Sequence, residues 1–424
     1  MTPNGGFDGR ETSLYAIGSF GTGAFSTVPS VLLLYFCTEI VGISSGVAAL
    51  IVFLPKLWAL FWDPFVGGWS DRTVSRFGRR RPFLALGAVG TGIAFVLLFA
   101  PPAMAPAGQA LWVGLGYFAL VTCYALFAVP YVAIPAEFGG TPLDRSRLVG
   151  WRMAAAMIGV LAGGALAPML VAAAGGGRTG YAVMALWLGG ACAVAMLAPL
   201  LVLGGRDGPV AAAVARAPLW DQVRAALRDR AFRWLVIAYV LMLAAAGLIS
   251  ASAPYLIVHA LSRSEADIGV ALGIMLVATS LTAPMLAWAG RRWGEARALT
   301  VSIIAYMLAA AIVALAARHH HWPAMLAGFA LAGPAFAGLQ VLPYTIAAHL
   351  IHARSAVESA AEGALTGIWT AAEKIGLALG PLATALALAM VGRDYAGGLA
   401  GFVMLATAAL GMLAIPSLRR AARA

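Results

Sequence analysis

The chain has 424 residues, of which 62% are hydrophobic and only 11% are charged, and its mean hydropathy is +0.89. Soluble domains carry about 25% charged residues, so this composition excludes a water-soluble globular protein and indicates a chain whose solvent is the lipid bilayer. The three cysteines, Cys37, Cys123 and Cys192, lie in apolar runs, which predicts buried free thiols and no disulfide framework.

Apolar segments of membrane-spanning length recur along the whole chain. About 20 apolar residues suffice for a helix to cross a bilayer, and twelve such segments are predicted. In chain order they cover 13–38, 45–70, 82–101, 110–135, 148–174, 180–204, 232–260, 267–290, 298–317, 323–349, 360–391 and 397–418. The predicted fold class is therefore an all-α membrane protein with twelve transmembrane helices.

The net charge of +11 comes mainly from arginines, which cluster in alternate connectors. Connectors after the second, fourth, sixth and eighth spans carry two or more arginines each, the one after the tenth carries Arg354, and the termini add Arg10, Arg419, Arg420 and Arg423. The intervening connectors hold only Arg178, Arg263, Arg318 and Arg393. By the positive-inside rule, both termini are predicted to be cytoplasmic. The basic excess thus indicates topology and contacts with anionic lipid, with no nucleic-acid partner. The Arg- and Ala-rich composition favours a bacterial inner (cytoplasmic) membrane.

The longest polar connector, 205–231, divides the spans into six and six. It is predicted to be a cytoplasmic linker that ends in a short amphipathic helix, from about Leu219 to Arg233. The expected domains are therefore an N-terminal six-helix bundle, 1–204, and a C-terminal six-helix bundle, 232–424. This plan is typical of major facilitator transporters, whose substrate site lies between the halves near the middle of the membrane.

The connector between the second and third spans carries the most specific motif. It reads Gly67-x-x-x-Asp71-Arg72, followed by Gly78-Arg79-Arg80-Arg81, and it resembles the signature loop of the major facilitator transporters. We expect Gly67 to allow a close approach between helices, Asp71 to cap a helix N-terminus or pair with an arginine, and Gly78 to turn the chain. A purely topogenic basic loop would explain the arginines but not Asp71 and the glycines. The loop is predicted to act as the inner gate.

Further motifs narrow the resemblance. Asp63-Pro64 precedes the loop, Tyr35 to Gly42 ends the first span, Pro130-Tyr131 lies in the fourth, and Ile368 to Pro381 lies in the eleventh. Together they resemble the glycoside–pentoside–hexuronide:cation symporter family, the relatives of melibiose permease. The resemblance implies cation-coupled symport of a sugar or glycoside by alternating access, without cofactor or enzymatic activity.

The resemblance also implies roles for charged residues. Asp63 matches the second of two aspartates that form the family's cation site, and the first falls on Ala59. Lys374 matches the lysine that links the cation and sugar sites, and Lys56 falls on an arginine of melibiose permease. Because a sodium ion requires several oxygen ligands and a proton requires only one carboxylate, the loss at Ala59 favours H⁺ over Na⁺ as the coupling ion.

Other family positions concern the substrate. The two aspartates that hold the galactoside in melibiose permease fall on Gly23 and Ala128, so both carboxylates are missing, whereas Arg152 matches an arginine of the family's fifth helix. The departures make a melibiose-like substrate doubtful. A facilitator of lipid-like or aromatic compounds, and a membrane sensor or assembly factor without transport, remain alternatives.

The positions of the charged residues support a functional site inside the membrane without reference to any family. Lys56, Asp63, Glu373 and Lys374 lie inside predicted spans, where each charge costs roughly 2.5–3.5 kcal/mol on translocon-insertion scales. They are therefore expected to face a wet cavity or one another, or to form structural ion pairs between helices. Lys56 and Asp63 share a helix face. Glu373 and Lys374 diverge by about 100°, so we expect Lys374 to face the cavity and Glu373 to face a neighbouring helix.

Aromatic and polar residues suggest a substrate wall. Tyr117, Tyr124 and Tyr131 recur every seven residues, a pattern that suits sugar or aromatic binding and equally suits packing. The remaining candidates for substrate binding are Arg152, Gln340, Tyr344 and Trp369, with Gly333-Pro334 and Gly338 able to bend the helix of Gln340. The run His319-His320-His321 is read as a solvated loop and not as a zinc site. The expected partners are a small-molecule substrate and the lipid bilayer, with no obligate protein partner.

Overall fold

The computed structural model describes residues 8–138, 141–203, 228–355 and 361–421, and it contains no strand in these ranges. Twelve of the described helices are long and apolar enough to cross a membrane, which confirms the predicted all-α class and number of spans. Contacts divide the chain into two compact units, Met1–Ala212 and Ala213–Ala424.

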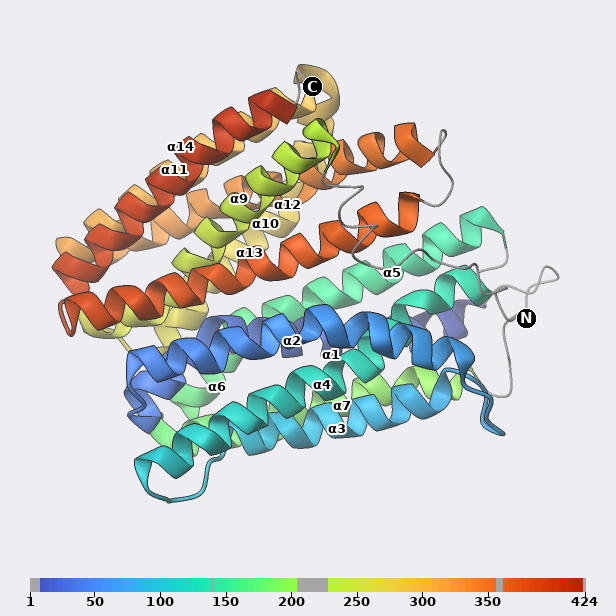
Figure 1. The fold of residues 1–424 in the computed structure, drawn as a ribbon. Coiled ribbons are helices and arrows are strands. Elements are labelled where there is room, and N and C mark those ends of the chain that lie inside the picture. The colour runs from blue at the N-terminus through green and yellow to red at the C-terminus, as the bar shows by residue number, and fades with distance from the viewer. Residues whose placement is uncertain (1–7, 139–140, 204–227, 356–360, 422–424) are drawn as a thin grey trace. The chain divides into compact units, whose positions relative to one another are not determined.

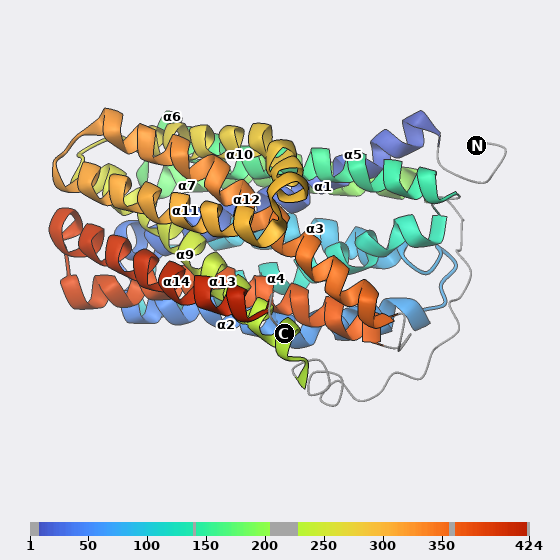
Figure 2. The same ribbon diagram turned by 90° about the horizontal axis from the view of Figure 1, so that it is seen from above.

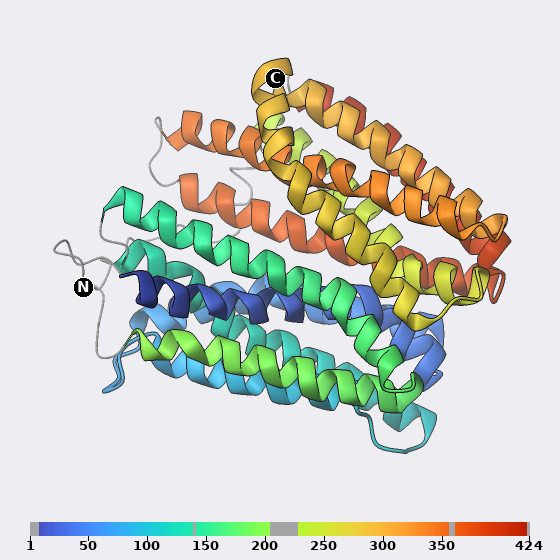
Figure 3. The same cartoon turned by 180° about the vertical axis from the view of Figure 1, so that it is seen from behind.

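Helices of the first unit run side by side (Figure 1). Their bounds are α1 Gly9–Val28, α2 Ser45–Arg72, α3 Arg81–Phe99, α4 Pro106–Phe138, α5 Pro142–Leu161, α6 Ala167–Ala173 and α7 Gly177–Leu197. Short π-helical turns extend α1 and join α5 to α6, so α5 and α6 form one span. α1 packs against α5 and α7, and α4 packs against α2 and α3 (Figure 3).

The second unit has the same number of spans. Its helices are α9 Arg230–Tyr255, α10 Glu265–Trp293, α11 Glu295–Arg318, α12 Trp322–Ser355, α13 Ala361–Val391 and α14 Ala400–Ala421. α9 packs against α13 and α14, and α12 packs against α10 and α11 (Figure 2). The Asp229 carboxylate caps α9 by accepting the backbone N–H groups of Ala231 and Phe232.

Glycines allow the closest helix contacts in each unit. In the first unit a Cβ at Gly23 of α1 would overlap the Ala156 carbonyl oxygen of α5, and one at Gly159 would overlap the Phe20 carbonyl oxygen of α1. Because lipid offers no hydrophobic driving force between helices, such backbone approach is a main source of packing energy. It also explains why position 23 has no carboxylate, since the crossing leaves no room for a side chain.

The sequence predicted a linker with an amphipathic helix between two six-helix bundles, and free buried cysteines. Most of the predicted linker and of its amphipathic helix lies in residues 204–227, outside the described residues, and the proposed bundle limits remain predictions. The three thiols are free, as expected, and Cys37 and Cys192 are buried, but Cys123 is only partly buried, which departs from the expectation.

Candidate functional site

Lys56 and Asp63 lie on α2, each beside a proline. Both side chains are partly buried, and Pro55 and Pro64 occur inside the helix. A proline inside a helix leaves the carbonyl four residues earlier without its backbone donor. The charged residues therefore lie in a stretch of α2 that has extra backbone acceptors. Lys56 forms no ion pair or hydrogen bond with any described residue.

Two tryptophans that the sequence reasoning did not single out connect this stretch to α4. The indole N–H of Trp58 donates to the Thr122 hydroxyl at 3.2 Å, and that of Trp62 donates to the Thr122 carbonyl at 3.0 Å. Their rings stack with centroids 5.4 Å apart. The four-residue spacing of Trp58 and Trp62 was the available signal, because it places both rings on one helix face. These bonds fix α2 against α4 beside Asp63.

The tyrosine stripe of α4 is largely used for packing inside the first unit. Tyr131 is fully buried and donates to the Tyr15 carbonyl at 2.6 Å, while the Tyr15 hydroxyl donates to the Tyr131 carbonyl at 3.0 Å. Tyr117 is buried as well, at 4% exposure. Tyr124 is half-buried, and its hydroxyl lies 3.4 Å from the Thr22 carbonyl. The packing alternative therefore accounts for Tyr117 and Tyr131, which leaves Tyr124 as the binding candidate.

Arg152 on α5 is the second candidate of the first unit. Its side chain is half-buried, and its Nε atom is buried without a hydrogen-bond partner among the described residues. One terminal nitrogen lies 3.7 Å from the Met153 sulfur. A guanidinium without a carboxylate partner retains donors for an external oxygen-rich ligand.

The signature loop connects α2 to α3. Asp71, in the last turn of α2, pairs with Arg80 at 2.6 Å, and Arg80 also donates to the Ser70 hydroxyl at 2.6 Å. Of the two alternatives for Asp71, the structure thus selects pairing with an arginine. Gly78 turns the chain as predicted, with φ of +90°. Arg79 is buried beside the turn, whereas Arg72 is exposed and Arg81 begins α3.

Within the first unit the described residues show no close helix approach at Gly67, so the expectation for this glycine stays a prediction. A Cβ at this position would lie 3.5 Å from the nearest side-chain atom, Val129 Cγ1. This is an ordinary van der Waals distance, so the contact between α2 and α4 does not require glycine there.

An aromatic cluster lies beside Glu373 in the second unit. The Tyr344 hydroxyl of α12 donates to the Glu373 carboxylate of α13, in line with the expectation that Glu373 faces a neighbouring helix. Trp369 stacks on Tyr239 of α9 with ring centroids 4.2 Å apart and planes 6° from parallel. Tyr344 meets both rings edge-on, at 6.0 Å and 5.7 Å. Tyr239 was not predicted, because no motif in α9 distinguishes it from a packing residue.

Gln340 and Lys374 lie on the same two helices as this cluster. Both are partly buried, and Gln340 makes no hydrogen bond to a described residue. The expected bend at Gly333-Pro334 does not interrupt α12, which is continuous from Trp322 to Ser355. The Gly333 carbonyl accepts a hydrogen bond from Thr279 of α10.

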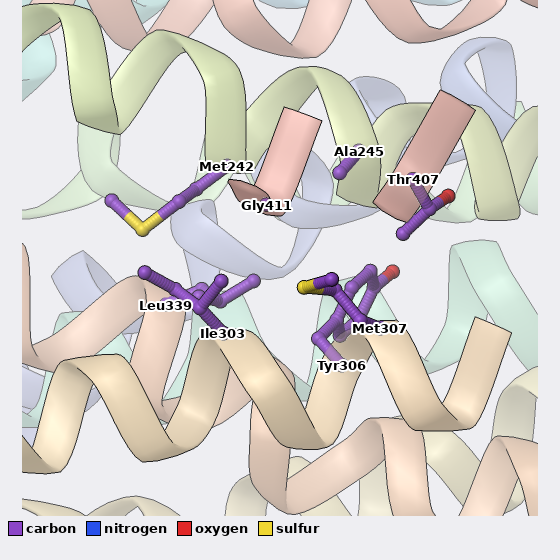
Figure 4. A pocket seen from close by; sticks show the side chains of 8 residues that line it. All are labelled: Met242, Ala245, Ile303, Tyr306, Met307, Leu339, Thr407 and Gly411. Carbon is purple, nitrogen blue, oxygen red and sulfur yellow. The ribbon is translucent and has the colours of Figure 1, made fainter. Parts of the chain in front are cut away.

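One small cavity lies inside the second unit (Figure 4). Its volume is about 10 Å³, and it is lined by Met242, Ala245, Ile303, Tyr306, Met307, Leu339, Thr407 and Gly411. This is about the space of one water molecule, far below the roughly 300 Å³ of a small-molecule pocket. Although the Tyr306 and Thr407 hydroxyls are buried there without described partners, the cavity is too small for a sugar.

Two histidines of the run, His320 and His321, make hydrogen-bonding contacts with nearby backbone groups. His320 Nδ1 lies 2.6 Å from the Ala260 carbonyl oxygen, and His321 Nδ1 accepts the Ala324 N–H at 3.1 Å. Among the described residues, no three His, Cys, Asp or Glu side chains gather in a way that could hold a metal ion.

Solved structures with this fold are transporters. The D-xylose–proton symporter matches 96% of this chain and 96% of its own length with a TM-score of 0.71 and 15% identity. At this identity the likeness establishes the fold alone. Twelve spans and the signature loop thus define a protein with the major facilitator fold, integral to a membrane.

The family model for MFS/sugar transport proteins matches residues 14–418, and the chain belongs to this family. YagG of Escherichia coli (strain K12), assigned by name to the glycoside/cation symporters, is 33% identical over 169 residues, which are 39% of this chain and 37% of YagG. The isoprimeverose transporter of Lactiplantibacillus pentosus is 22% identical over 69% of this chain and 62% of its own length. The matched regions thus span about a third to two thirds of these relatives. Their names confirm the resemblance to the glycoside–pentoside–hexuronide:cation symporters.

Proposed function

We propose that this protein is a secondary active transporter that carries a sugar or glycoside together with a proton by alternating access. It works in a bacterial cytoplasmic membrane with both termini inside. The observation that carries the proposal is the placement of Asp63 and Lys374 within the spanning helices α2 and α13. Ionisable residues at such depth are costly and mark ion or substrate pathways.

In this mechanism Asp63 accepts the coupling proton and Lys374 is its counter-charge. Protonation of Asp63 removes a negative charge, which frees Lys374 to change its contacts. Lys56, without an ion pair among the described residues, adds a positive charge on the same face of α2 as Asp63. The pair of Asp71 and Arg80 then holds the inner gate between transport steps.

The proposed substrate class is inferred from the polar side chains that packing does not account for. Tyr124 and Arg152 of the first unit, with Gln340 of the second, are polar, partly buried and able to bind hydroxyl groups. Relatives named for glycosides and for isoprimeverose support the same class. Because Gly23 lies at a tight helix crossing and Ala128 has no polar group, the substrate is held without the two carboxylates that bind galactosides in melibiose permease.

The deciding experiment is uptake into proteoliposomes under separately imposed proton and sodium gradients. A thermal-shift screen with sugars, glycosides, uronic acids and lysolipids first selects the substrate, since a ligand stabilises the state it binds. We expect accumulation to follow the proton gradient. The Asp63→Asn variant should lose accumulation and retain exchange, whereas Asp267→Asn, a control at the first turn of α10, should behave like the wild type.

Accumulation that follows sodium alone, or that survives in Asp63→Asn, would refute the assignment of the coupling site. Downhill movement of lysolipids or aromatic compounds without either gradient would favour the facilitator alternative. A protein that moves none of these compounds, and keeps its cellular role without Asp63 and Lys374, would be a sensor or assembly factor.

A further inference from the structure

Glu373 has an unusual environment for a carboxylate inside a spanning helix. Its only hydrogen bond among the described residues comes from the Tyr344 hydroxyl. The rings of Tyr239 and Trp369 pack beside Tyr344. Tyr239 and Trp369 are 0% and 2% exposed, and neither the Tyr239 hydroxyl nor the Trp369 indole N–H has a hydrogen-bond partner among the described residues.

Within the second unit, the described residues of the helices packed against this part of α13 bring no cation into contact with Glu373. The titratable group that α9 contributes is Tyr239, and the one α12 contributes at the carboxylate is Tyr344. His349, farther along α12, lies 3.4 Å from Glu295. On α13 itself Lys374 follows directly, but adjacent residues of a helix diverge by about 100°, and no ion pair joins the two side chains.

An ionised carboxylate with one neutral donor is poorly compensated in an apolar environment, where unpaired charges tend to neutralise. The neutral acid is compatible with the same neighbours, because a phenol hydroxyl can donate to a carboxylate and can accept from a carboxylic acid. Tyr344 is also 41% exposed, so the pair is not sealed inside the bundle. Both protonation states therefore have a hydrogen bond, and the pair lies next to exposed surface.

We propose that Glu373 is a proton-binding site of the second bundle, with Tyr344 as the positioning residue that holds the carboxyl group in both protonation states. The step is a simple proton transfer, in which the carboxylate takes up one proton from water and later returns one. The inference deepens the proposed proton coupling and rests on it for its role in transport. It gives each bundle one proton-accepting carboxylate, Asp63 in the first and Glu373 in the second.

The test is infrared difference spectroscopy of the purified protein in lipid during a pH jump, which needs neither substrate nor transport. Wild-type protein should show the C=O stretch of a protonated carboxylic acid that disappears as the pH rises. In Glu373→Gln this band should be lost, and in Tyr344→Phe it should shift to higher frequency because its hydrogen bond is gone. Glu265→Gln, at the start of α10, is the matched control and should leave the band in place.

A band that is unchanged in both Glu373→Gln and Tyr344→Phe would overturn the proposal. Because Tyr344→Phe keeps the carboxyl group, it tests the idea even if Glu373→Gln fails to fold. Asp63→Asn separates the two sites, since loss of proton-driven uptake with the Glu373 band intact supports both assignments. If uptake proves independent of protons while the Glu373 band is present, the coupling proposal fails and the proton site stands.

Discussion

Gly380 of α13 lies against Gly247 of α9 so closely that a Cβ at position 380 would overlap the Gly247 backbone. Gly376 approaches α9 one turn earlier, where a Cβ would lie 2.7 Å from Leu243 Cβ. The pair α9 and α13 in the second unit thus meets through glycines, as α1 and α5 do in the first. Small residues at such crossings are the usual means of helix association in lipid.

The first prediction is that Gly380→Ala destabilises the protein. The new methyl group has to push α9 and α13 apart, and overpacking of this kind costs about 1–3 kcal/mol. We expect a lower melting temperature in detergent or lipid. Gly367→Ala on the same helix is the control, because a Cβ there meets no atom within 4 Å. Equal melting temperatures for the two variants would show that the crossing is looser than described.

The second prediction separates packing from binding along the α4 stripe. Tyr131→Phe removes the hydrogen bond to the Tyr15 carbonyl and should reduce the free energy of unfolding by about 1 kcal/mol. Substrate affinity should be unchanged. Tyr117→Phe is the control, because its hydroxyl makes no hydrogen bond to a described residue. A large loss of affinity in Tyr131→Phe with normal stability would restore the binding interpretation.

The third prediction concerns the gate loop. Asp71→Asn weakens the pair with the buried Arg80 and should slow transport several-fold while it changes equilibrium substrate affinity much less. Arg79→Ala, in the same loop, should act in the same direction. Arg292→Gln, in the last turn of α10, is the control, because Arg292 is exposed and has no partner among the described residues. If affinity fell tenfold while turnover per bound substrate stayed normal, the loop would not be the gate.

The fourth prediction tests the topology. In a background without Cys37, Cys123 and Cys192, single cysteines are placed at Arg292, in the last turn of α10, and at Arg393, after α13. Both positions are exposed. A membrane-impermeant maleimide should label Arg393→Cys in intact cells and label Arg292→Cys only after permeabilisation, because arginine-rich connectors stay in the cytoplasm. The reverse pattern would invert the proposed orientation.

The sequence by itself determined the membrane class, the twelve spans and the family. These follow from local properties, because hydrophobic length decides where a helix crosses the bilayer and the motif from Gly67 to Arg81 depends on spacing along one connector. Gly78 could be predicted as a turn for the same reason. So could the divergence of Glu373 from Lys374, which is a consequence of helix geometry alone.

Only the tertiary structure decided which faces of the helices meet. The partners Tyr344 and Glu373 are 29 residues apart, and Tyr15 and Tyr131 are 116 apart; helical periodicity places each residue on a face but does not say which neighbour that face contacts. For the same reason the sequence could not show which of two glycines, Gly67 or Gly23, lies at a close helix crossing. Within the first unit Gly67 has ordinary space beside it, whereas Gly23 lies at a backbone crossing, because α1 and α5 bring their backbones together there and α2 and α4 do not do so at Gly67.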